Sequence, residues 1–203
     1  MASKETNREP QPPKELAPTL IEALPRIDLT EAWKNSLAGV ETEGRPYFGY
    51  GTRVDDDDGY ALGRYQMRRP GLRDAGMLDG DRWTGKYGIN SIEDFSNNPA
   101  AQEAALKDLT AKIDGYIKRR GHDKRVGKTI ASDLGMLDLS YGKLVAAIHN
   151  QGIGATSDYL RWIEQNGWDS RGKVKTISDE KRQKAFKGVE TRLSKFPEVP
   201  YKE

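Results

Sequence analysis

Apolar residues recur at helical spacing over much of this chain. The clearest helix is predicted to begin at Asn98-Pro99, a favourable N-cap and first helical residue, and to end at Gly121. Apolar side chains recur between these points every three or four residues, at Ala101, Ala105, Leu109, Ile113 and Tyr116. The pattern therefore predicts a long amphipathic helix in the middle of the chain.

Three further helical patterns follow in the second half of the chain. They cover about residues 140–149, 155–165 and 178–194. Ser140 and Ser178 precede two of them, and serine is a favourable N-cap because its hydroxyl accepts a hydrogen bond from a free backbone N–H. We expect the first two of these helices to meet at a junction after residue 149.

Another helix is predicted to begin at Asp28, near the start of the chain. Asp28 and Glu31 form a capping-box pattern, and Gly44 and Pro46 are expected to stop the helix. One face of this helix carries Trp33, Leu37 and Val40, and Glu41 shares that face at its end. Glu41 is thus expected at the C-terminal end of this helix near its buried side, where burial and the helix dipole both raise the pKa of a carboxyl.

Residues 47–67 follow a different pattern. Glycines and aromatic residues alternate there around an acidic run at 55–58, as in a β-hairpin or an irregular flap. Residues 68–97 are rich in loop-forming residues, with a short helix expected around 71–76. The predicted fold class is mainly α (α+β), a helical domain with a small β-hairpin flap.

Composition divides the chain into an arm and a domain. Residues 1–26 hold five of the ten prolines and are interpreted as an extended arm or linker, either a disordered tail or a tether to a larger assembly. Residues 27–203 are expected to form one domain with a C-terminal helix and tail. With 35% hydrophobic and 32% charged residues, this domain is expected to have a lean core under a charged surface.

Charge and cysteine content exclude several classes of protein. The chain has 33 Lys plus Arg against 31 Asp plus Glu, so no global basic field indicates nucleic acid as a partner. It has no cysteine, and its two histidines, His122 and His149, lie far apart in sequence, so we expect no metal site and no cofactor. No apolar run approaches the length of a membrane span, and the polar N-terminus does not fit a Sec signal peptide.

Three short motifs occur in one order and carry the candidate chemistry. They are VETEG at 40–44, GYALGRYQM at 59–67 and AAIHNQGIGATSDYL at 146–160. Together they resemble the soluble lytic transglycosylase and goose-type lysozyme superfamily, and GYALGRYQM also resembles phage-tail and secretion-spike lysozyme domains. The chain departs from the superfamily pattern at Thr42, where serine is usual, and at His149, where tyrosine is usual.

The resemblance implies a lysozyme-like fold over roughly residues 31–165 and cleavage of peptidoglycan glycan strands. Glu41 would be the general acid that protonates the leaving oxygen of the glycosidic bond. A hydrolase also needs a second carboxylate, for which Asp58 and Asp57 are candidates. In lytic transglycosylases one Glu suffices, because the 6-hydroxyl of the sugar itself attacks.

Alternatives stay open for the acidic run. Residues 55–58 are also typical of a solvated turn. They weakly resemble a calcium loop, but Gln66 stands where such a loop requires its final glutamate.

The candidate substrate-binding residues also have structural interpretations. Gln66 and Asn150 are expected to hydrogen-bond the substrate, or else to bond local backbone. Tyr60 and Tyr65 are expected to stack on sugar faces, or else to form the core of the flap. His149 is a candidate substrate contact or a satisfied structural ring.

Two functions from different classes remain. The first is an enzyme, a muramidase or lytic transglycosylase whose partner is the peptidoglycan glycan strand in the periplasm or cell wall. The alternative is a non-catalytic wall-binding or structural component of a phage tail or secretion apparatus. In either case the N-terminal arm is a candidate docking segment, and delivery is expected through a phage particle, a holin or a secretion system.

Overall fold

The computed structural model describes residues 29–42, 49–56 and 59–202. Its first helix, α1 (Glu31–Thr42), begins later than the sequence predicted. Thr30 is the N-cap, because its hydroxyl oxygen accepts a hydrogen bond from the Trp33 backbone N–H at 3.1 Å. Asp28 lies outside the described residues. The apolar spacing of the helix is confirmed, since Trp33 and Leu37 are fully buried.

A small antiparallel sheet follows α1 and matches the predicted flap. Its strands β1 (Arg53–Asp56), β2 (Gly59–Leu62) and β3 (Met67–Arg68) lie in that order, with Val54 opposite Ala61 and Leu62 opposite Met67. The β2 residues Tyr60, Ala61 and Leu62 are buried. The sheet is thus one wall of the core and not an isolated flap.

Short elements connect this sheet to the long central helix. The predicted short helix is confirmed, although α2 begins and ends about two residues earlier than expected. The elements are α2 (Arg69–Asp74), β4 (Leu78–Asp79), β5 (Arg82–Trp83), the 3-10 turn η3 (Lys86–Gly88) and α3 (Ile92–Ser96).

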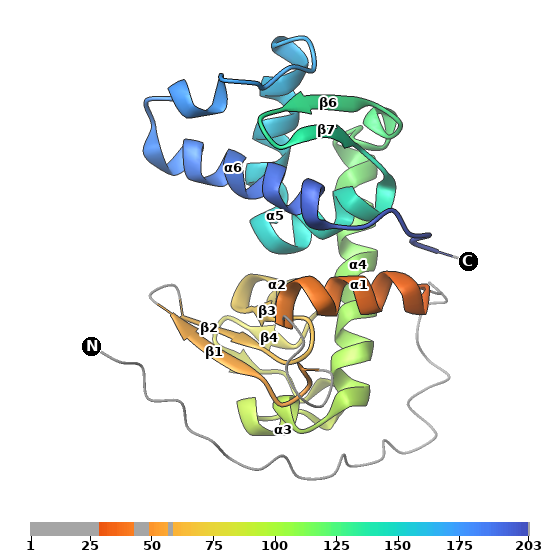
Figure 1. Cartoon of the computed structure of the whole chain (residues 1–203). Coiled ribbons are helices and arrows are strands. Elements are labelled where there is room, and N and C mark those ends of the chain that lie inside the picture. The colour runs from red at the N-terminus through yellow and green to blue at the C-terminus, as the bar shows by residue number, and fades with distance from the viewer. Residues whose placement is uncertain (1–28, 43–48, 57–58, 203) are drawn as a thin grey trace.

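The long helix α4 (Pro99–Arg119) confirms the strongest sequence pattern. The Asn98 side chain accepts a hydrogen bond from the Ala101 N–H at 3.0 Å, and Gly121 adopts a left-handed φ of 66° just after the helix. In Figure 1, α4 runs through most of the height of the molecule. The sheet, α2 and α3 surround one half of it, and α5 and α6 surround the other half.

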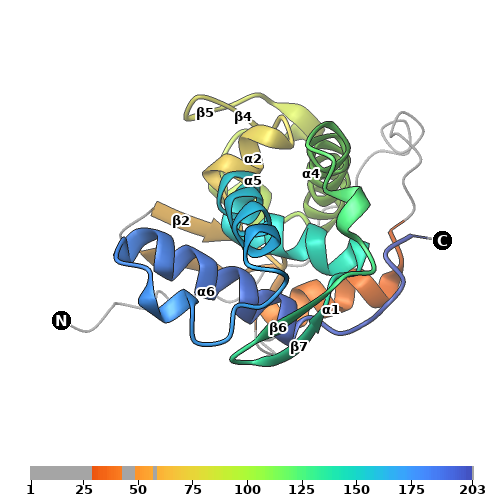
Figure 2. The ribbon, with the colours of Figure 1, turned by 90° about the horizontal axis from the view of Figure 1, so that it is seen from above.

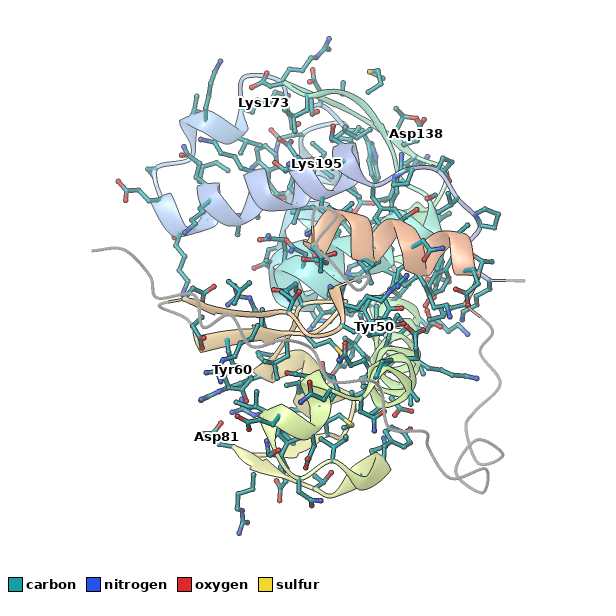
Figure 3. The ribbon with its side chains drawn as sticks, turned by 60° about the horizontal axis from the view of Figure 1, so that its bottom comes forward. Tyr50, Tyr60, Asp81, Asp138, Lys173 and Lys195 are labelled. Carbon is teal, nitrogen blue, oxygen red and sulfur yellow. The ribbon has the colours of Figure 1, made fainter. Side chains whose placement is uncertain are left out.

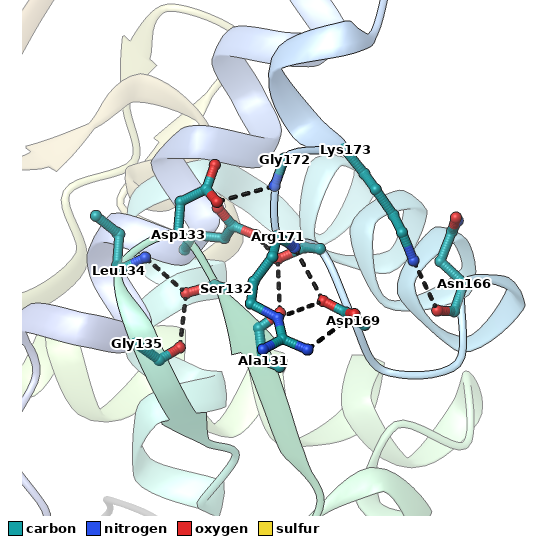
Figure 4. Close-up of polar contacts among 12 residues, drawn as sticks. Ala131, Ser132, Asp133, Leu134, Gly135, Asn166, Asp169, Arg171, Gly172 and Lys173 are labelled. Carbon is teal, nitrogen blue, oxygen red and sulfur yellow. Dashed lines mark hydrogen bonds and ion pairs between the residues drawn. The ribbon is translucent and has the colours of Figure 1, made fainter.

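A second hairpin after α4 was not predicted. The 3-10 turn η4 (Asp123–Arg125) leads to β6 (Thr129–Ser132) and β7 (Gly135–Asp138), which pair antiparallel with Ile130 opposite Leu137. The loop after α5 pairs with the far side of β6, where the Ala131 N–H donates to Trp168 O at 2.9 Å (Figure 4). The hairpin is therefore held by tertiary contacts.

The helices predicted at 140–149 and 155–165 form one element, α5 (Tyr141–Gln165), with a break inside it. The break lies at Gly152, whose φ of 78° and ψ of 159° are not helical. Ser140 caps the start of α5 as predicted. Viewed from above in Figure 2, α5 lies in the centre, with α2, α4, α6 and α1 around it.

The last helix, α6 (Glu180–Lys195), follows the 3-10 turn η5 (Val174–Thr176). Its N-cap is Asp179 and not the predicted Ser178, since the Asp179 side chain accepts from the Arg182 N–H at 2.9 Å. After α6 the chain returns to the start of α1, where Leu29 and Lys202 form an antiparallel bridge. The predicted mainly α class with small antiparallel hairpins is confirmed.

Candidate active site

The candidate site begins at the end of α1, where Glu41 extends from the buried side of the helix. Trp33, Leu37 and Ala38 bury that face, so the side chain of Glu41, one turn further on, is carried inward. It is only 9% exposed. A carboxylate so little exposed requires partners, since burial disfavours its charged form.

The first partner is His149, supplied by the break in α5. The helix stops being regular at Gly152, and the turn just before it places the imidazole against the end of α1. His149 Nδ1 lies 3.6 Å from Glu41 Oε1, and the His149 side chain is 3% exposed. The first and third sequence motifs, more than a hundred residues apart, thus meet in space.

The second partner is Arg192 on α6, which the sequence did not indicate. Its Nη2 lies 2.8 Å from Glu41 Oε1, and its side chain is 8% exposed. Val189 and Leu193 anchor α6 in the core and leave Arg192 beside them, on the edge of the buried face. A polar residue near an apolar helical face is a weak signal by itself, because most such arginines extend into solvent.

These partners reverse the expected pKa shift of Glu41. Burial alone raises the pKa of this carboxyl, but the neighbouring imidazole of His149, the charge of Arg192 and the nearby amide of Asn150 together outweigh burial. The pKa of Glu41 therefore lies below its ordinary value, and the prediction of a raised pKa is wrong. The residue is ionised at neutral pH in this conformation.

The same cluster has hydrogen-bonding capacity that the described residues do not use. Glu41 Oε1, both ring nitrogens of His149 and Arg192 Nη1 are buried and make no well-formed hydrogen bond among the described residues. Buried polar atoms are normally hydrogen-bonded, so such a group is typical of a functional site. Its atoms can both donate and accept, as a hydroxyl-rich ligand requires.

Asn150 lies beside this cluster and is exposed. Its Oδ1 accepts a hydrogen bond from Gln151 Nε2 at 2.6 Å. His149, Asn150 and Gln151 also line a pocket of about 210 Å³, which extends towards Asp74 on α2 and Tyr116 on α4. An accessible amide next to a buried charged cluster is suited to hydrogen-bond a polar ligand.

Gln66 adopts the local alternative that the sequence left open. Its Nε2 donates to the Gly63 carbonyl at 2.8 Å, and its φ of 44° is left-handed. The side chain is half-buried and, among the described residues, makes no hydrogen bond with Glu41. The Gln66 amide therefore bonds local backbone in this conformation.

Tyr65 belongs to the core and not to a cleft surface. It is 1% exposed, and its hydroxyl donates to Glu103 on α4, which also accepts a hydrogen bond from Tyr50 at 2.6 Å. The guanidinium of Arg64 lies over both rings. The expectation that Tyr65 stacks on a sugar is wrong for this conformation, because its ring has no free face.

Tyr60 also packs inside the protein. It is 9% exposed, and the guanidinium carbons of Arg53 and Arg69 lie 5.7 and 5.0 Å from its ring centroid. In Figure 3, Tyr50 lies close to the coils of α4, whereas Tyr60 lies farther from that helix. Tyr60 and Tyr65 are both buried, so the aromatic residues of the second motif do not form one exposed stacking surface.

The acidic run is described only in part. Asp55 and Asp56 are exposed and pair with Arg53 and Arg68, respectively. Asp57 and Asp58, the candidates for a second carboxylate, lie outside the described residues. Within the described part of the chain, no group of three or more His, Asp or Glu side chains is placed to hold a metal ion.

Comparison of the chain with protein-family models, curated proteins and solved structures gave no match. Among the helices of the described residues, none is long and apolar enough to cross a membrane.

Proposed function

We propose that this chain cleaves the glycan strand of bacterial peptidoglycan, with Glu41 as the residue that transfers the proton. One observation carries the proposal, namely the buried cluster in which Glu41 meets His149 beside the accessible amide of Asn150. These are three of the residues that the resemblance to lytic transglycosylases and goose-type lysozymes assigns to the site. The cluster also has unused hydrogen-bonding capacity.

The proposed reaction requires a proton on Glu41, although the free site favours the ionised form. Burial and the two basic side chains act in opposite directions on this carboxyl. A bound glycan that draws both the His149 ring and the Arg192 guanidinium towards its hydroxyls would weaken the contacts that lower the pKa of Glu41, and the effect of burial would then prevail. The pKa of Glu41 would then rise in the complex, where the glycosidic oxygen needs its proton.

The proposal includes a transglycosylase route that needs one carboxylate. Among the described residues, those that pair with Glu41 or shift its pKa include no second carboxylate. In this route, as the resemblance implies, Glu41 protonates the leaving oxygen as the glycosidic bond breaks. The Glu41 carboxylate then takes the proton of the sugar's 6-hydroxyl, whose oxygen attacks the anomeric carbon. A hydrolase would instead use a second acid, such as Asp57 or Asp58. Mass spectrometry separates the routes, because the first leaves anhydro ends and the second leaves reducing ends.

The decisive experiment is digestion of purified cell walls by the wild type and by Glu41→Gln. The variant keeps the size of the side chain but cannot donate the proton, so the rate should fall about 100-fold or more. Glu93→Gln, on the exposed surface of α3, is the matched control and should digest walls at the wild-type rate. Equal rates for Glu41→Gln and the wild type would remove Glu41 from the mechanism.

A further control is needed, because Glu41→Gln could lose activity simply by unfolding. The change leaves Arg192 without its charged partner, and loss of one member of a buried pair is often destabilising. The double variant Glu41→Gln with Arg192→Met removes both charges and should also be inactive. Circular dichroism of each variant shows whether the fold is retained.

A second candidate function is favoured by the lowered pKa of Glu41. A buried carboxylate kept ionised by His149 and Arg192 is also what a purely structural cluster would show. In that case the chain binds cell wall or a larger phage-tail or secretion complex without turnover, with the N-terminal arm as the docking segment. Wild-type protein that sediments with walls but releases no glycan fragments would support this function over the enzyme.

A further inference from the structure

Positive charge is concentrated near the C-terminal end of the chain. Residues 171–195 carry nine Lys and Arg against three Asp and Glu, a net charge of +6. The whole chain carries only +2, so the other 178 residues carry −4. The near-neutral total therefore hides a strongly basic segment on a mildly acidic protein.

The basic residues of α6 lie mainly on one face of the helix. Lys181, Lys184, Lys187 and Lys195 are exposed. At 3.6 residues per turn these four positions fall within about a third of the circumference of the helix. Phe186, Val189 and Leu193 are buried on the opposite face. We call these four lysines the α6 lysine face.

The described acidic residues do not neutralise this face. No described carboxylate forms an ion pair with any of the four lysines, and Lys187 Nζ only donates to Gln183 Oε1 at 3.2 Å. The basic residues of the loop before α6 do have partners within the protein (Figure 4). Arg171 pairs with Asp169, and Lys173 Nζ donates to the Asn166 carbonyl. The α6 lysine face is thus available to an external anion.

We infer that the α6 lysine face binds a phosphodiester polymer attached to the bacterial wall, and that it holds the protein on its glycan substrate. The choice of this polymer rests on the proposed function. A flexible chain with one phosphate per repeat can place negative charges opposite lysines at successive turns of a helix.

Nucleic acid is less well matched by the same surface. Proteins that bind single strands add exposed aromatic rings on which bases stack. The aromatic residue of α6 is Phe186, which is 1% exposed and lies under the Arg182 guanidinium. The face also presents lysines and not the forked guanidinium groups that read base edges.

The test compares a triple variant, Lys181→Gln with Lys184→Gln and Lys187→Gln, with the unmodified chain. Both proteins carry Glu41→Gln so that walls are not digested, and binding is measured to soluble poly(glycerol phosphate). We expect affinity to fall at least tenfold in the triple variant. The slope of log affinity against log salt should decrease by about 2, because three phosphate contacts are lost.

A matched control separates position from total charge. Lys118, Lys124 and Lys128 are exposed outside α6, and their replacement by Gln removes the same charge. This control variant should bind like the unmodified protein. Equal losses in the two triple variants would overturn the inference, because net charge alone would then explain binding.

Two further arms decide the nature of the polymer. Walls stripped of phosphodiester polymers should retain less protein than intact walls, and retention by stripped walls at the intact level would overturn the inference. Tighter binding to duplex DNA than to poly(glycerol phosphate) at equal phosphate concentration would also overturn it. No arm requires glycan cleavage, so failure of the proposed enzyme activity would leave these results interpretable.

Discussion

At the scale of single residues, the ionisation of Glu41 depends on the balance between burial and its polar neighbours. Removal from water disfavours the charge, while His149, Arg192 and Asn150 favour it. Arg192 is the partner with the shortest contact, at 2.8 Å. Burial also disfavours the charged form of Arg192 and lowers its pKa, whereas the negative charge of Glu41 raises that pKa. Each side chain therefore keeps the other charged.

Replacement of Arg192 by Met should raise the pKa of Glu41, because burial then opposes fewer favourable charges. The titration of the Glu41 carboxyl, followed by carbon NMR, should move to higher pH. The variant should lose about 3 kcal/mol of unfolding free energy at neutral pH, as expected when one partner of a buried pair is removed. This loss should shrink in acid, since a protonated Glu41 no longer needs the arginine.

Arg192→Lys provides the comparison, because it keeps a positive charge at the same place. Its Glu41 titration should lie between those of the wild type and Arg192→Met. An unchanged Glu41 titration in Arg192→Met would show that the ion pair does not control the carboxyl.

At the scale of elements, the site depends on the close approach of α6 to the break in α5. A Cβ atom added at Gly188 on α6 would lie 2.5 Å from Gln151 Cδ. Gln151 in turn donates its hydrogen bond to Asn150. Because Gly188 has no side chain, Gln151 can lie against α6 and hold the Asn150 amide beside Glu41.

Gly188→Ala should therefore separate stability from activity. Alanine favours the helix by up to about 1 kcal/mol relative to glycine, and the end of the Gln151 side chain can swing away, so the melting temperature should be unchanged or higher. The displaced Gln151 releases Asn150, and wall digestion should slow several-fold.

Gly39→Ala on α1 is the control for this change. A Cβ at that exposed position meets no atom within 4 Å, so it should bring the gain in helix stability with normal digestion. If Gly188→Ala digested walls as fast as Gly39→Ala, the link between α6 and Asn150 would be disproved.

The sequence predicted elements best where local signals were strong. Asn98-Pro99 and Ser140 gave correct helix starts because cap chemistry depends only on neighbouring residues. The starts at Asp28 and Ser178 were wrong because a better-placed neighbour, Thr30 or Asp179, makes the capping bond. A cap motif locates a helix start only to within a few residues.

Elements and contacts that depend on distant parts of the chain were not predictable. The hairpin of β6 and β7 is held by the loop after α5, which no local pattern reveals. Arg192 reaches Glu41 only because α6 packs on α5. The resemblance implied that Glu41 and His149 belong to one site, whereas the surroundings of Tyr65 and Gln66 depend on Glu103 and on local backbone geometry.

At the scale of the whole molecule, α4 joins the half that contains the sheet to the half that contains α5 and α6 (Figure 1). Just beyond its end, His122 ties α4 to α5. His122 is 2% exposed; its Nδ1 accepts from Arg125 Nη1, so its Nε2 carries the hydrogen and donates to the Ser157 hydroxyl at 2.7 Å. Burial, followed by the charges of Arg125 and other nearby arginines, lowers the pKa of His122 to about 4.

This histidine should make the whole protein less stable in mild acid. Above about pH 6.5 it is neutral in both states, but from pH 6.5 down to about 4 only the unfolded chain takes up the proton. The unfolding free energy should therefore fall by up to about 3 kcal/mol over this range and then level off for this group. Urea unfolding at several pH values measures the loss.

His122→Gln should flatten that dependence, although it lowers stability at neutral pH. Ser157→Ala removes the hydrogen bond but keeps the imidazole, so the dependence on pH should remain. The assignment to His122 fails if His122→Gln loses as much stability between pH 6.5 and 4 as the wild type.

The bridge between Leu29 and Lys202 brings the two ends of the described chain together. Thr30 strengthens this closure by hydrogen bonds to the backbone of Tyr201 and Pro200. Segments that continue from Leu29 and from Lys202 therefore leave the described domain at neighbouring points. An attachment made directly at Leu29 or at Lys202 would thus hold the domain on the same side.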